Sequence, residues 1–82
     1  MFLLEFLLEI NIFTSIEIYK DEDKVYRVIG YLKGNIIFTG GDAYTLESAL
    51  KDLVVKSRDY FNPQQRATLK KAFDIDLNME AE

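Results

Sequence analysis

The sequence has no cysteine, no histidine and no tryptophan among its 82 residues, and it has a single proline. Without cysteine the chain has neither a disulfide framework nor a thiolate metal site, which fits a reducing compartment and leads us to expect a cytoplasmic protein. Without histidine it lacks the side chain that titrates nearest neutral pH and that most often binds metals. Of the schemes for nucleophilic catalysis, only those that use serine with lysine, or carboxylates, remain.

The residues that remain do not form a recognisable catalytic or metal-binding pattern. Asp21-Glu22-Asp23 lacks the spacing and the glycine of a calcium loop, so a solvated turn is expected there. Gly40-Gly41-Asp42 matches neither the dinucleotide-binding nor the phosphate-loop motif. No motif surrounds the three serines, Ser15, Ser48 and Ser57. We therefore expect no enzymatic activity, no cofactor and no metal site.

The composition is that of one small folded domain that spans residues 1–82. Apolar residues make up 49% of the chain, and aromatic residues 13%, which is enough for a packed core. The formal net charge is −4, which fits a partner that is basic better than it fits a general nucleic-acid coat. The acidic tail from about residue 76 is expected to fray.

The first thirteen residues, MFLLEFLLEINIF, are unusually apolar. Their periodicity fits a helix or a strand, but leucine and glutamate favour a helix near residues 2–9, and the isoleucines that follow favour a strand near residues 11–20. The segment lacks the basic start of a secretory signal, is too short to span a bilayer, and is acidic, so we expect no membrane association.

The apolar arc of this expected helix is wider than a three-stranded sheet covers. We therefore expect an apolar surface for a second copy of the chain, as in a homodimer, or for another protein. The alternative is that the sheet and the helical segment 46–61 cover this arc inside one monomer. The residues of the expected surface are Phe2, Leu3, Phe6 and Leu7.

The middle of the chain predicts an antiparallel meander. The polar stretch 21–24 joins the strand near 11–20 to a second strand over Val25–Ile29, which is a hairpin signal. A turn at 33–35 follows, where Gly34 or Asn35 supplies a positive φ, and a third strand is expected over Ile36–Thr39. The glycine pair at 40–41 is expected to end that strand.

Two helices are predicted after the strands. The first has one buried face, with Asp42 or Thr45 as its N-cap, formed by Leu46, Ala49, Leu50, Leu53 and Val54. The second begins at Asn62-Pro63-Gln64-Gln65, with asparagine at the cap, proline at the first position and glutamine at the third. The predicted fold is therefore α+β in the order α-β-β-β-α-α, with helices on one face of a three-stranded antiparallel meander.

Charged residues gather in two parts of the sequence. An acidic hairpin is a candidate surface for a protein partner, through Glu17, Asp21, Glu22 and Asp23. A basic segment over residues 58–71 has Tyr60 and Phe61 between its charges and is the alternative, a nucleic-acid contact, through Arg58, Arg66, Lys70 and Lys71. The element order also resembles the double-stranded-RNA-binding domain, but residues 45–50 lack that family's lysine cluster.

Residues 16–53 resemble the N-terminal domain of HicB antitoxins. The resemblance is carried by two strands, a turn and the helix start Gly41-Asp42-Ala43-Tyr44-Thr45-Leu46-Glu47-Ser48-Ala49-Leu50. The family's Leu-Pro-Gly-Cys segment is absent, and Leu32-Lys33-Gly34-Asn35 stands in its place. The resemblance implies a dimeric protein that neutralises a ribonuclease toxin.

The predicted architecture is also similar to that of small acidic anti-CRISPR proteins encoded by phages, although no motif is shared. That similarity implies a protein that binds a nuclease and places carboxylates where phosphates would lie. Together the resemblances lead us to expect a non-catalytic interaction protein that neutralises a nucleic-acid-handling enzyme, with a basic nuclease as the expected partner. The alternatives are nucleic-acid binding through residues 58–71 and a purely structural subunit of an assembly.

Overall fold

The computed structural model describes residues 2–77 and confirms the predicted order of elements. The helix α1 (Leu3–Glu9) comes first, followed by the strands β1 (Phe13–Lys20), β2 (Tyr26–Leu32) and β3 (Ile37–Ala43). The helix α2 (Leu46–Lys56), a single 3₁₀ turn η1 (Arg58–Tyr60) and the helix α3 (Pro63–Phe73) complete the chain. The strands form an antiparallel sheet in the order β1-β2-β3, as the two short connections predicted.

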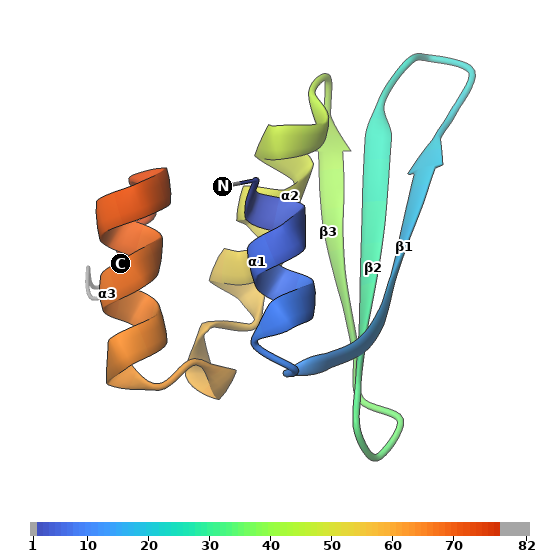
Figure 1. Ribbon diagram of the computed structural model, residues 1–82. Coiled ribbons are helices and arrows are strands. Elements are labelled where there is room, and N and C mark those ends of the chain that lie inside the picture. Colours follow the sequence, from blue (N-terminus) through green and yellow to red (C-terminus); the bar gives the residue numbers. More distant parts are fainter. Residues whose placement is uncertain (1, 78–82) are drawn as a thin grey trace.

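The three helices lie on the same side of the sheet (Figure 1). The helices α1 and α2 are next to the sheet, and α3 stands farther away, beside α1. The rings of Phe6 on α1 and Phe73 on α3 are 5.6 Å apart between centroids, and those of Phe13 on β1 and Phe61 are 6.5 Å apart. The core therefore lies between the sheet and the helices, and the opposite face of the sheet is left uncovered by residues 2–77.

The join between α1 and β1 is short because the chain reverses at Asn11. This residue has a φ of 64°, in the left-handed region that asparagine tolerates better than most residues. Helix α1 therefore ends at Glu9, and the strand begins at Phe13 instead of near residue 11. Immediately after Phe13 the register of β1 against β2 shifts at a bulge, where the hydroxyl of Thr14 donates to the backbone oxygen of Tyr31 at 2.9 Å.

The strand β3 is longer than the sequence predicted, because the glycine pair continues it. Gly40 pairs with Val28 and Gly41 with Arg27, so the expectation that these glycines end the strand was wrong. A Cβ atom on Gly40 would lie 2.5 Å from the backbone nitrogen of Leu53 on α2. The glycine is therefore required for the close approach of α2 to β3.

The helix caps follow the sequence closely. Thr45 caps α2, and its Oγ1 accepts from the backbone N–H of Ser48 at 3.2 Å. Asn62 and Gln65 form the predicted capping box of α3, in which each side chain accepts from the other residue's backbone N–H, at 2.7 and 2.9 Å. The N-cap of α2 is thus Thr45, one of the two predicted residues.

Of the tail that is predicted to fray from about residue 76, the structure describes only Asp76 and Leu77. The chain leaves α3 through Asp74, whose φ is 58°, and then returns Ile75 and Leu77 to the core. Both side chains are buried. The rest of the predicted frayed tail, residues 78–82, lies outside the described residues.

Candidate functional site

The uncovered face of the sheet carries a mixed apolar and polar surface. Because residues paired across an antiparallel sheet point to the same side, the register places the neighbours of the buried Val28 and Leu32 on the opposite face. Tyr19 and Ile37 are half exposed on that face, at 50% and 56%. We call this surface the open face, and its six defining residues are Glu17, Tyr19, Arg27, Ile29, Tyr31 and Ile37.

Glu17 lies on the edge strand β1 of the open face and is held by two tyrosines. The hydroxyl groups of Tyr19, on the same strand, and Tyr31, on β2, each donate to Oε1 of Glu17 at 2.8 Å. The bond from Tyr19, and then that from Tyr31, lowers the pKa of the Glu17 carboxyl below its ordinary value. The same hydrogen bonds to Glu17 raise the pKa of both phenols, so the carboxylate stays charged and the phenols stay protonated near neutral pH.

The three acids of the hairpin turn are not equivalent. Oδ1 of Asp21 accepts from the backbone N–H of Asp23 at 2.9 Å and of Val25 at 3.1 Å, and Oδ2 lies 3.6 Å from Nε of Arg27. Asp21 therefore builds the turn, as aspartate commonly does through its side chain. Glu22 and Asp23 are exposed. The turn presents two carboxylates to solvent, and Glu17 lies apart from them on the open face.

The expected apolar surface of the N-terminal helix is corrected by its burial. Leu3, Phe6 and Leu7 are all at or below 7% exposure, within the core of a single chain. Phe73 from α3 and residues of α2 and β1 cover the arc that the sequence assigned to a second chain. Only Phe2, at 75%, remains exposed among the four residues.

Half of the predicted basic contacts are engaged within the chain. Nε and Nη2 of Arg66 donate to the backbone oxygens of Phe61, at 3.0 Å, and Arg58, at 2.7 Å. Lys70 Nζ lies 2.8 Å from Oδ2 of Asp76, and this hydrogen bond raises the pKa of the lysine. Lys71 is exposed on the same helix. Two of the four predicted nucleic-acid contacts, Arg66 and Lys70, thus have partners inside the protein.

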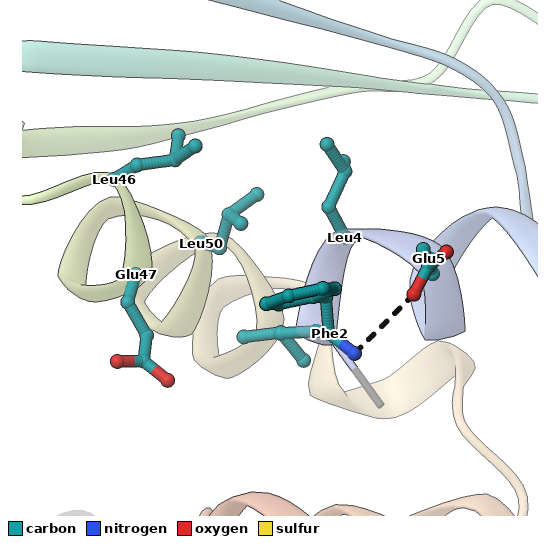
Figure 2. A pocket seen from close by; sticks show the side chains of 7 residues that line it. Phe2, Leu4, Glu5, Leu46, Glu47 and Leu50 are labelled. Carbon is teal, nitrogen blue, oxygen red and sulfur yellow. Dashed lines mark hydrogen bonds between the residues drawn. The ribbon is translucent and has the colours of Figure 1, made fainter.

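A second candidate surface is an apolar groove between the N-terminal ends of α1 and α2. It encloses about 540 Å³, and Leu4, Leu46 and Leu50 face one another across it (Figure 2). The ring of Phe2 extends from α1 toward α2 beside them. Two acids, Glu5 and Glu47, complete the lining with Leu3. We call this feature the α1–α2 groove.

The sequence did not single out the tyrosines of the open face as functional residues, nor Leu4, Leu46 and Leu50 of the groove, whereas Phe2 and Leu3 of the groove belong to the predicted apolar surface. The alternation of Glu17 and Tyr19 along one strand is a signal for a shared face. The approach of Tyr31 to Glu17 depends on the register of β1 against β2. The groove depends on how α1 meets α2. Among residues 2–77, no group of three or more acidic, histidine or cysteine side chains is placed to hold a metal ion. No helix within that range has the length and apolar character needed to cross a membrane.

Comparison with known proteins finds no matching family model, no similar curated protein and no similar solved structure. The resemblance to HicB antitoxins therefore rests on the residues quoted for it, 16–53. These residues include most of β1, all of β2 and β3 and the beginning of α2, and so they contain the six defining residues of the open face.

Proposed function

We propose that the chain is a non-catalytic interaction protein that binds another protein through the open face and neutralises it. The observation that carries this proposal is the uncovered sheet face, where Tyr19 and Ile37 are half exposed and two tyrosines hold a charged glutamate. Tyrosine and arginine are among the residues that most often dominate binding energy at protein interfaces. The open face offers Tyr19, Tyr31 and Arg27 together.

The hydrogen bonds within the open face favour rigid recognition. Tyr19 and Tyr31 are both held on Glu17, so their rings are oriented before a partner arrives. Binding then loses less side-chain freedom than it would with mobile side chains. Both phenolic oxygens keep lone pairs that accept hydrogen bonds from a partner.

The partner that we propose is a basic nucleic-acid-handling enzyme, such as a nuclease. The net charge of −4 supports a basic partner, because opposite net charges speed association. Locally the hairpin is nearly balanced, since Lys20, Lys24 and Arg27 accompany its four carboxylates. The resemblance of residues 16–53 to HicB antitoxins supports a nuclease as the class of partner. The defining residues of the open face lie within this range.

Quantitative co-purification from native host lysate tests the proposal. We expect the immobilised chain to enrich a basic protein and the purified partner to lose its action on nucleic acid when the chain is added. The Tyr19→Ser, Ile37→Ser double variant removes exposed apolar area from the open face and is expected to reduce enrichment about tenfold. The Tyr44→Ser variant is the matched control, because Tyr44 is 78% exposed outside the open face.

The competing functions give different results in the same series. A chain that retards RNA or DNA in a gel at low salt, and loses this on Arg58→Glu and Lys71→Glu substitution, is a nucleic-acid-binding protein. Light scattering tests the expected homodimer, whose apolar basis at Leu3, Phe6 and Leu7 is buried in the single chain. Equal enrichment by the open-face double variant and the wild-type chain contradicts the proposal.

A further inference from the structure

We infer that the α1–α2 groove is a second docking site, which takes a short amphipathic helix with apolar residues on one side and lysine or arginine beside them. The groove is lined by the α1 and α2 ends on the helical side of the sheet, so its residues are distinct from those of the open face. The inference goes beyond the proposed function and does not depend on it.

The shape and lining of the groove fit an apolar guest. The volume of about 540 Å³ exceeds that of a packing defect and has room for more than one large apolar side chain. Leu3 and Leu50 are buried, while Leu4 and Leu46 are half-buried and Phe2 is 75% exposed. A helix laid between α1 and α2 would cover Phe2, Leu4 and Leu46, which is the helix-in-groove mode of recognition.

The charge around the groove selects the kind of guest. Glu5 and Glu47 are the charged residues among those that line it, and no lysine or arginine is among the described lining residues. Oε1 of Glu5 is 3.5 Å from the backbone nitrogen of Phe2, while the Glu47 side chain extends away from the leucines (Figure 2). A guest helix with basic residues beside its apolar stripe would bring positive charge to both carboxylates.

The acidic lining of the groove argues against two other occupants, a second copy of the chain and the final residues of the sequence. A second copy has a net charge of −4 and would bring its own acids toward Glu5 and Glu47. The final residues of the sequence, 78–82, contain Glu80 and Glu82 and no basic residue. Charge complementarity therefore favours a basic segment of a different protein as the occupant of the groove.

The test is an NMR titration of the ¹⁵N-labelled chain with a synthetic peptide. The peptide is about fourteen residues long, with leucine and phenylalanine at helical spacing and lysine at the remaining positions. A peptide with the same composition in scrambled order is the first control. We expect saturable amide shifts confined to residues 2–5 and 46–50, and no comparable effect of the scrambled peptide.

Two charge reversals of equal size make the result specific. Glu47→Lys is expected to weaken peptide binding about tenfold, whereas Glu22→Lys, in the hairpin turn, is expected to change it less than about twofold. Phe2→Ala removes a groove residue that is 75% exposed, so it weakens binding without threatening the fold. The Tyr19→Ser, Ile37→Ser variant is expected to bind the peptide normally, which separates this inference from the proposed function.

Three results would overturn the inference. The first is equal weakening by Glu47→Lys and Glu22→Lys, which indicates attraction to the whole acidic surface. The second is binding of the scrambled peptide as strongly as the amphipathic one. The third is a set of concentration-dependent shifts at residues 2–5 and 46–50 without any peptide, which identifies a second copy as the guest.

Discussion

The hydroxyl of Tyr31 on β2 donates to the carboxylate of Glu17 on β1 at 2.8 Å, across the sheet face that no helix of residues 2–77 covers. The two residues are not directly opposite each other, since Glu17 is paired with Ile29 and Tyr31 with Ser15. The bond is therefore a diagonal contact, which long aromatic side chains can make between neighbouring strands. This hydrogen bond links β1 to β2 on the open face.

The first prediction concerns the ionisation of the open face. Glu17→Gln replaces the charged acceptor of the two hydrogen bonds that raise the pKa of the phenols with a neutral one, so the pKa values of Tyr19 and Tyr31 should fall toward the ordinary value of 10.0. Ultraviolet titration of the phenolate absorbance measures this shift. The same titration of a Glu9→Gln variant is the control, and an unchanged tyrosine titration in Glu17→Gln would show that the carboxylate does not hold the phenols.

The same bonds predict a pH dependence of stability. The folded-state pKa of Glu17 is lower than its ordinary value of 4.5, so its contribution is present above about that pH and is lost as the pH falls through the lower, folded value. The stability difference between the wild-type chain and Glu17→Gln should therefore shrink as the pH falls below 4.5. Urea unfolding over a series of pH values measures it, and a difference that grows in acid would contradict the assignment.

The side chain of Asp21 is predicted to stabilise the hairpin turn. Asp21→Ala removes the acceptor of two backbone N–H groups and should lower the free energy of unfolding by about 1–2 kcal/mol. Asp21→Asn keeps an oxygen acceptor and should have a smaller effect. Glu22→Ala, in the same turn, is the control and should change stability by less than about 0.5 kcal/mol. Equal effects at Asp21 and Glu22 would show that the turn does not depend on the Asp21 side chain.

The close approach of α2 to β3 predicts that Gly40 tolerates no side chain. A Cβ there would meet the backbone of Leu53, at 2.5 Å from its nitrogen and 2.7 Å from its Cα, and neither atom can move without shifting the helix. Gly40→Ala should therefore lower the free energy of unfolding by about 3 kcal/mol or more. Gly34→Ala, which meets no atom within 4 Å but keeps a φ of +82°, should cost about 1 kcal/mol. Thermal or urea unfolding compares the two, and a milder effect at Gly40 than at Gly34 would contradict the packing.

The burial of α1 predicts that truncating Phe6 lowers the stability of the protein much more than truncating Phe2. Phe6→Ala opens a cavity against Phe73 and should lower the free energy of unfolding by about 3–5 kcal/mol. Phe2→Ala, at a side chain that is 75% exposed, should change it by less than about 1 kcal/mol. Urea unfolding of both variants measures the difference. Similar small effects at both positions would mean that the Phe6 side of α1 is not packed in the core.

Local signals in the sequence were enough for the order of elements and for the start of α3. The capping box of Asn62 and Gln65 is written into four consecutive residues, and the hydrophobic spacing of α2 into nine, so both could be predicted. The end of β3 could not, because Gly40 and Gly41 suit a turn equally well. Only the approach of α2 shows why glycine continues the strand.

The candidate site was predicted less well, because it depends on contacts between distant residues. The burial of Leu7 requires cover from helices that lie tens of residues later in the chain, so the apolar arc was assigned to a partner. Asp21 looked like one acid of a patch, and only its two bonds to backbone N–H groups reveal that it builds the turn. The contact between Tyr31 and Glu17 depends on the register of β1 against β2, which is continuous from the hairpin turn to Ser15.

Binding of a protein partner to the open face is best tested by an NMR map of the contact. The ¹⁵N-labelled chain is titrated with the basic protein that co-purifies with it. We expect amide signals to broaden or shift along the open face, at Glu17, Tyr19, Ile29, Tyr31 and Ile37. The Tyr19→Ser, Ile37→Ser variant is expected to bind the partner about tenfold more weakly. Changes confined to residues 58–71, with the open-face signals unaltered, would contradict it.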